Sequence, residues 1–368
     1  MRLYSLNTQD NNDSKNLIKQ IKMRKSIYIL LALFVIMAFD AKAGNPDRQG
    51  EAGAYELLMN PWARSSGLHT LGTAHIRGVE AIRLNPSGLS YINKTELVFS
   101  RGIYMAGSDV FMNSAGLAQR VGKNGVLGLS IMSLDFGDIP ITTTAQPEGT
   151  GGTFSPSFTN IAFSYAHLFG NKISVGATVR AINQSASNVS ATGVAVDAGI
   201  QYSNENVRLG ISLRNIGTPL SYDGEGLSQV STSPNGQTLM TVNQRSARFE
   251  LPTVLNIGGA YDINVDEKNK ITIVANFTSN SFSRDEIGAG AEYTFNKAFS
   301  VRSGYRYELG QGSSPEIEAP LYSGISAGAS LNVAPNKKKP DNKIGVDYSF
   351  RSTNVYQGTH NIGIRISL

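Results

Sequence analysis

The chain has 368 residues, 38 of them glycine, no cysteine and a formal net charge of +5. Seven Lys/Arg and three Asp/Glu lie in residues 1–43, so the other 325 residues hold 26 basic and 25 acidic groups and are nearly neutral. This balance gives no electrostatic case for nucleic-acid binding, and the lack of cysteine excludes disulfides and thiolate metal sites.

Residues 1–43 are predicted to be a targeting segment. A basic start, Met23-Arg-Lys, precedes an apolar run that ends at Phe39, and Ala41-Lys42-Ala43 has the small-x-small pattern of a cleavage site. This is the pattern of a secretory signal peptide, with residues 1–22 as an upstream extension. The apolar run is shorter than the roughly 20 residues of a membrane-spanning helix, so an uncleaved anchor is the weaker alternative.

Residues 44–96 show no alternation of apolar and polar side chains. Ala54–Met59 and Val79–Leu84 each precede an Asn-Pro pair, which predicts two short helical turns that stop there. The only tryptophan, Trp62, also lies in this part of the chain. We predict a compact plug, or hatch, ahead of a sheet.

From Leu97 to the end, apolar and polar residues alternate with a period of two. In the last stretch, Ile362 and Ile364 fall on one face while Arg365 falls on the other, which indicates a strand with one apolar side. The same pattern predicts fourteen strands, at about 97–105, 110–121, 125–136, 158–168, 172–184, 193–202, 206–216, 253–261, 270–278, 287–295, 299–308, 321–331, 343–350 and 358–368.

These strands favour a barrel in a membrane. Many exceed the mean of about five or six residues and suit a tilted span of roughly 9–11. Their links alternate between short ones, such as 122–124 and 169–171, and longer ones, such as 137–157, 185–192 and 217–252. The links 262–269 and 332–342 are exceptions, because the alternation would make them periplasmic although they are longer than tight turns. Outer-membrane barrels have tight periplasmic turns and larger external loops, and strands cross lipid only when the sheet is closed. We therefore predict an all-β, antiparallel outer-membrane barrel over 97–368; a secreted sandwich or propeller is the alternative.

The polar face of the strands carries charges at mid-strand, which we expect to face the lumen and to pair there. These residues are Arg180, Asp197, Arg208, Glu292, Arg302, Arg306, Asp347 and Arg365.

No catalytic or cofactor motif is found. The four histidines, at positions 69, 75, 167 and 360, show no metal-ligand spacing. Asp223-Gly224-Glu225 is explained by turn chemistry. We expect neither an enzyme nor a bound cofactor.

Asn85-Pro86-Ser87 resembles the Asn-Pro-Ala hatch motif of the FadL family of outer-membrane transporters, from which Ser87 departs by one small residue. Together with Asn60–Gly67 and Arg77–Leu89, it is similar to the PorV/PorQ branch found in Bacteroidota. The motifs that carry this resemblance lie within residues 53–89, whereas the shared architecture covers most of the chain after residue 43.

The resemblance implies an accessory or interaction protein of the type IX secretion system, for cargo shuttling or surface attachment. The partners expected from it are outer-membrane lipid and either other secretion-system proteins or a surface lipoprotein. Two alternatives stay open: a FadL-like channel for hydrophobic small molecules, and a structural barrel that anchors a partner lipoprotein.

Overall fold

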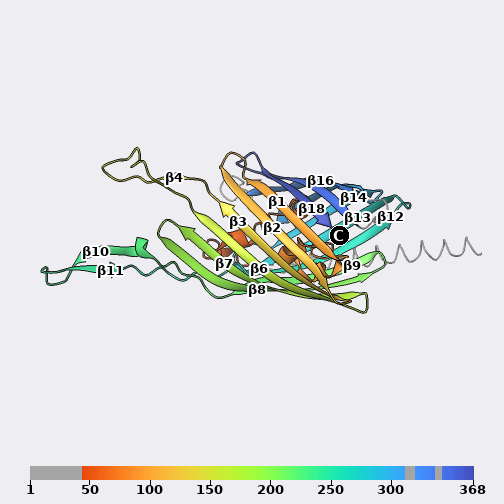
Figure 1. The fold of residues 1–368 in the computed structure, drawn as a ribbon, viewed down its shortest axis with the longest axis horizontal. Coiled ribbons are helices and arrows are strands. Elements are labelled where there is room, and N and C mark those ends of the chain that lie inside the picture. The colour runs from red at the N-terminus through yellow and green to blue at the C-terminus, as the bar shows by residue number, and fades with distance from the viewer. Residues whose placement is uncertain (1–43, 311–319, 336–341) are drawn as a thin grey trace, which may run out of the picture. The chain divides into compact units, whose positions relative to one another are not determined.

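The computed structural model describes residues 44–310, 320–335 and 342–368, so the predicted signal peptide lies outside the described residues. Fourteen strands form one closed antiparallel barrel (Figure 1), which confirms the predicted fold class. The strands are β1 (Thr95–Tyr104), β2 (Val110–Val121), β3 (Gly125–Asp135), β6 (Ser157–Phe169), β7 (Ile173–Ala186), β8 (Val189–Asn204), β9 (Val207–Gly217), β12 (Val254–Asn264), β13 (Asn269–Asn280), β14 (Glu286–Phe295), β15 (Phe299–Glu308), β16 (Tyr322–Val333), β17 (Lys343–Thr353) and β18 (Thr359–Ser367).

The last strand closes the barrel against the first. β18 pairs antiparallel with β1, in a register that places Ile364 opposite Phe99 and Ile366 opposite Leu97. Every barrel strand therefore has two neighbours, and no row of backbone N–H and C=O groups is left at an open edge.

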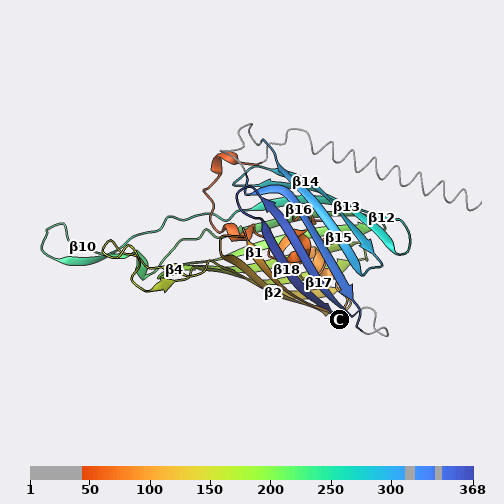
Figure 2. The ribbon, with the colours of Figure 1, turned by 90° about the horizontal axis from the view of Figure 1, so that it is seen from above.

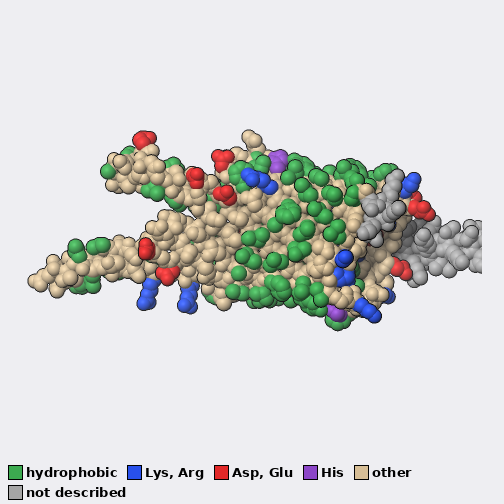
Figure 3. All heavy atoms as spheres, in the orientation of Figure 1, with side chains coloured by type: hydrophobic (Ala, Val, Ile, Leu, Met, Phe, Trp, Pro, Cys, Tyr) green, Lys and Arg blue, Asp and Glu red, His purple; other side chains and the backbone are tan. Residues whose placement is uncertain are grey.

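The two faces of the wall differ as the alternation predicts. Ile362 and Ile364 are 58% and 49% exposed on the outside, whereas Asn361 and Gly363, which alternate with them, are buried. Apolar side chains cover the outer wall over most of the strands, and charged groups gather toward its two ends (Figure 3). This distribution is that of a wall immersed in lipid.

Two links are shorter than predicted. The link 185–192 is reduced to Ser187 and Asn188, because β7 and β8 continue past the predicted strand ends, and Ser187 has the left-handed φ of a tight turn. The link 262–269 is reduced to residues 265–268, where the carboxylate of Asp266 accepts the backbone N–H groups of Lys268 and Asn269.

The two longest links contain hairpins that the alternation did not reveal. One is β4 (Ile139–Pro140) with β5 (Thr153–Phe154), and the other is β10 (Ser228–Thr232) with β11 (Leu239–Asn243). Both extend away from the barrel at the end opposite the C-terminus (Figure 1).

Residues 54–92, which we term the inner segment, lie within the ring of strands (Figure 2). Short helices follow one another along and just before it: η1 (Pro46–Arg48), η2 (Tyr55–Leu57), α2 (Ala63–Ser66), α3 (Ala81–Leu84) and η3 (Pro86–Tyr91). The helix α2 packs on β1, β16, β17 and β18, and η3 packs on β3, β6, β7 and β8, so opposite parts of the wall contact the same segment.

An apolar core joins the inner segment to one side of the wall. Trp62, Ile82 and Leu89 pack with Val98 of β1 and Val126 of β3, and all five are buried. Among the described residues, no helix is long and apolar enough to cross a membrane.

Candidate functional site

The predicted hatch motif binds the wall through Asn85. Its Nδ2 donates to the backbone oxygen of Thr73 at 2.9 Å and lies 3.3 and 3.4 Å from the oxygens of Ile200 on β8 and Ile211 on β9. Its Oδ1 accepts from the hydroxyl of Ser87 at 2.7 Å. One amide side chain therefore links the inner segment to two strands.

The rest of the motif fixes the backbone at this point. Asn85 directly follows α3 and has the extended conformation that a following proline favours, and Pro86 begins η3. The backbone oxygen of Ser87 accepts from the Ser174 hydroxyl of β7 at 2.6 Å. Ser174 and its partner Ser90 are fully buried, so this contact lies in the interior of the barrel.

Glycines on the inner face of the wall allow this close approach. A Cβ built on Gly176 of β7 would lie 2.5 Å from the backbone oxygen of Pro86 and from the nitrogen of Ser87, and one on Gly199 of β8 would collide with Asn85. Eleven such glycines, on ten of the fourteen strands, face atoms of the inner segment, and we call them the glycine belt. They are Gly116, Gly128, Gly176, Gly199, Gly210, Gly258, Gly288, Gly290, Gly304, Gly328 and Gly363.

The glycine belt was not predicted from the sequence, although the sequence contains a pattern that indicates it. The polar faces of the predicted strands carry glycine repeatedly, and glycine weakens a strand unless another backbone must come close. A belt of glycines facing the lumen indicates a segment packed against the wall.

The predicted lumen charges all face inward, and each has an oppositely charged partner. Arg180 donates to Asp197 at 2.6 Å, and Arg302 donates to Glu292 at 2.8 Å, with all four side chains buried. Arg365 lies 3.4 Å from Asp347. These three contacts join residues that the sequence placed on the polar face.

Two of the predicted arginines have partners that sequence reasoning missed. Arg208 pairs with Asp262 of β12, and Arg306 lies 3.0 Å from Glu286 of β14. Asp262 lies beyond the predicted end of its strand, and Glu286 just before the predicted start of its own. Both acids were therefore counted as parts of links.

His75 of the inner segment joins this charge network. Arg208 donates to its Nδ1 at 2.8 Å, and its Nε2 lies 3.4 Å from a carboxylate oxygen of Glu292. Burial lowers the pKa of His75 to about 4, although Glu292 acts in the opposite direction. The imidazole is therefore neutral near pH 7, with its proton on Nε2.

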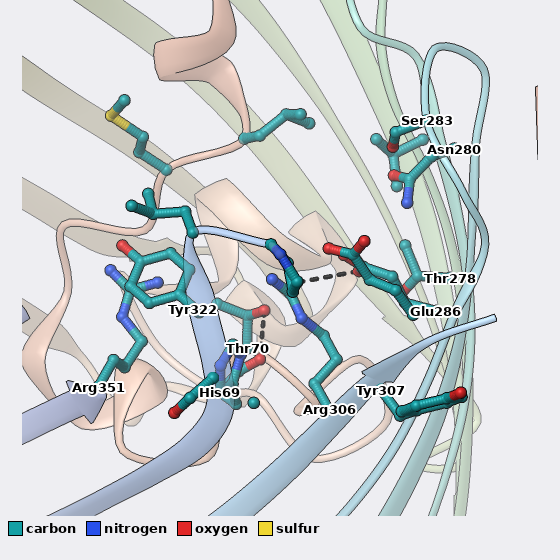
Figure 4. Close-up of a pocket in the computed structure, with 18 of the residues that line it drawn as sticks. His69, Thr70, Thr278, Asn280, Ser283, Glu286, Arg306, Tyr307, Tyr322 and Arg351 are labelled. Atoms are coloured by element: carbon teal, nitrogen blue, oxygen red, sulfur yellow. Dashed lines mark hydrogen bonds and ion pairs between the residues drawn. The ribbon is translucent and has the colours of Figure 1, made fainter. Parts of the chain in front are cut away.

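A cavity of about 480 Å³, the loop-side cavity, lies toward the end that carries the long links (Figure 4). The Arg306–Glu286 ion pair lies on one side of it, and the guanidinium of Arg351 stacks 4.5 Å from the centre of the Tyr322 ring on the other. His69 meets the same tyrosine edge-on, at 5.6 Å between ring centres. The lining is thus aromatic, charged and hydrogen-bonding.

A second cavity, of about 420 Å³, lies toward the short turns, and we call it the turn-side cavity. Lys268 and Lys297 come from two of these turns, and Arg64 comes from α2 of the inner segment. The two cavities share no lining residue. In the part of the chain that the structure describes, no group of three or more His, Cys, Asp or Glu could hold a metal ion.

Residues 150–366 match the family model of the type IX secretion system membrane protein PorP/SprF. This chain belongs to the PorP/SprF family. The match spans β6 to β18, together with the long link that holds β10 and β11. The residues that resemble PorV/PorQ, 53–89, lie outside it, so the match leaves that finer assignment open. The family is described as one of secretion-system membrane proteins.

The solved structures to which this chain is similar include proteins described as hydrocarbon channels or transporters. The toluene transporter TodX of Pseudomonas putida aligns with a TM-score of 0.53 at 13% identity, over 84% of this chain and 97% of that one. The toluene transporter TbuX of Ralstonia pickettii aligns at 0.51 and 13%, over 83% and 98%. The monoaromatic hydrocarbon channel CymD aligns at 0.50 and 16%, over 83% and 96%.

At such identities the likeness shows the fold alone. None of the curated proteins matches the sequence at a significant level.

Proposed function

We propose that this PorP/SprF family member is a plugged outer-membrane barrel that serves the type IX secretion system by binding other proteins. The inner segment acts as the plug, and the long links act as the contact surface. In this proposal the long links lie outside the cell and the short turns in the periplasm, as loop length suggests.

The observation that carries the proposal is the apolar surface of the β10–β11 hairpin. Val230 and Leu239 are 69% and 72% exposed, and Met240 and Val242 are exposed beside them. The hairpin extends beyond the barrel wall, so lipid facing that wall does not account for these side chains (Figure 1). Clustered apolar groups outside a lipid-facing wall are typical of a protein contact surface.

The lumen supports a plug more than a conduit. The inner segment contacts the glycine belt around the wall, and the two cavities on either side of it share no lining residue. Buried ion pairs such as Arg180–Asp197 lie on the lumen side of the wall, near Arg83 of the inner segment. A role in cargo shuttling or in surface attachment, as in the PorV/PorQ branch, fits this geometry.

The second candidate is a channel for hydrophobic small molecules, which the fold shared with TodX and TbuX favours. The loop-side cavity counts against it. Hydrophobic ligands occupy mostly apolar pockets, whereas this cavity holds an Arg306–Glu286 ion pair and the guanidinium of Arg351.

Affinity purification from outer membranes in mild detergent, followed by mass spectrometry, tests the proposal. We expect type IX secretion components to co-purify with the intact chain. The double variant Val230→Ser/Leu239→Ser should lose them, while Thr241→Ser in the same hairpin should retain them. Recovery of no secretion component with the intact chain would refute the role, and equal recovery with both variants would refute the hairpin as the contact surface.

A further inference from the structure

The turn-side cavity collects positive charge in a chain that is otherwise nearly neutral. Nine basic side chains line it against three acidic ones: Arg64, Arg77, Arg208, Lys268, Lys270, Lys297, Arg302, Lys343 and Arg365 face Asp266, Glu267 and Glu292. Asp262 and Asp347 lie behind the lining and pair with it. Glu80 and Glu96 also lie close enough to act on Arg64. With all four counted, nine cations against seven carboxylates leave an excess of two positive charges among the described residues.

Several of these cations have no acidic partner. The side chains of Arg64, Lys297 and Lys343 make no ion pair within 4 Å and no hydrogen bond among the described residues, although carboxylates including Glu292 lie near Arg64. Arg77 only stacks over the ring of Tyr91. Of the three acids in the lining, Glu292 is bound to Arg302 and His75, and Asp266 holds the backbone of its own turn. The excess charge is therefore not neutralised from within the lining.

A buried donor also points to a ligand. The Arg302 side chain is only 1% exposed; its Nε donates to Glu292 and one terminal nitrogen donates to Ser330, but the other, Nη1, has no partner. A buried guanidinium N–H without an acceptor is costly. Hydroxyl and amide groups of Ser300 and Asn332 line the same cavity and can add further hydrogen bonds.

Size and chemistry define the ligand class. The cavity volume of about 420 Å³ falls within the range of small-molecule sites. Guanidinium groups match the geometry of phosphate oxygens, and lysines add point charges to such sites. We propose that the turn-side cavity binds a small phosphate-bearing group, carried either by a free ligand or by a phospholipid headgroup.

Calorimetric titration of the full mature chain with inorganic pyrophosphate tests this proposal. The intact protein, folded in a zwitterionic detergent, should bind pyrophosphate saturably, and more weakly as salt is raised. Arg64→Gln and Lys343→Gln should each weaken binding about tenfold or more, because each removes a charged contact. Arg245→Gln, at an exposed position in the long link 217–252, is the matched control and should change nothing.

A second arm separates the two sources of phosphate. If mixed micelles that contain phosphatidylglycerol displace pyrophosphate, the ligand is a lipid headgroup; if they do not, it is a free molecule. The side chain of Lys343 makes no ion pair among the described residues, and this residue is partly exposed at the start of β17. Its variant therefore decides the matter even if Arg64→Gln folds poorly. No saturable binding of either probe, equal weakening by Arg245→Gln, or binding of polyglutamate in place of pyrophosphate would overturn the proposal.

Discussion

Replacing Gly176 by alanine should destabilise the barrel by forcing the inner segment away from β7. The new Cβ would lie 2.5 Å from the Pro86 oxygen and the Ser87 nitrogen, both backbone atoms. Carbon atoms in contact prefer about 3.5–4.0 Å, so the two backbones must separate by roughly 1 Å. Overpacking of this kind costs about 1–3 kcal/mol.

A glycine on the outer face of the barrel wall provides the control. Gly259 of β12 points to the lipid side, and a Cβ there would meet only one atom of Leu209, at 3.9 Å. Gly259→Ala should therefore leave the free energy of unfolding unchanged or raise it by up to about 1 kcal/mol, since alanine restricts the unfolded chain.

Equilibrium unfolding in urea, from lipid vesicles, measures both variants. The expected result is a lower midpoint for Gly176→Ala with no change in slope, and no loss for Gly259→Ala. Equal midpoints for the two variants would refute the packing of Pro86 against β7. So would a loss from Gly259→Ala as large as that from Gly176→Ala.

Three further predictions concern the faces, the topology and the charge network. Ile364→Arg should impair assembly by about 2–4 kcal/mol, because it puts a charge on the lipid face, whereas Arg365→Ile should cost less; heat-modifiable migration in gels measures folding, and equal effects would refute the face assignment. A protease site inserted at 235–237 should be cut on intact cells and one at Lys123 should not, and the reverse pattern would invert the orientation. Because burial lowers the pKa of His75 to about 4, its unfolded form binds the extra proton between about pH 6.5 and 4. As the pH is lowered from 6.5 to 4, the free energy of unfolding of the native chain should therefore fall by up to roughly 3 kcal/mol more than that of His75→Gln. Parallel pH profiles for the two proteins would contradict a buried, neutral imidazole.

The barrel was predictable because each strand has its own alternation of apolar and polar residues. A period of two marks every span, and closure follows from the need to satisfy backbone hydrogen bonds in lipid. The strand ends were less predictable: β7 and β8 continue beyond the apolar band to a tight turn at Ser187 and Asn188, where no lipid imposes alternation. The β10–β11 hairpin was not predicted either, because all ten of its residues are exposed and no buried face imposes an alternating pattern.

The packing inside the barrel could not be predicted in detail, because it depends on contacts between residues far apart in sequence. The motif Asn85-Pro86-Ser87 was visible, but its acceptors, Ile200 and Ile211, are 115 and 126 residues away. The glycines on the polar faces of the predicted strands were the sequence feature that indicated a segment packed against the wall. Their role is explained only by the structure, in which Gly176 lies against Pro86 and Gly199 lies against Asn85.

Conductance in planar bilayers tests most directly whether the inner segment seals the barrel. The full mature chain should be electrically silent, and a barrel lacking residues 53–90 should assemble and pass ions and small solutes. A deletion barrel as silent as the full chain would mean that the strands alone close the lumen, and it would contradict the plug.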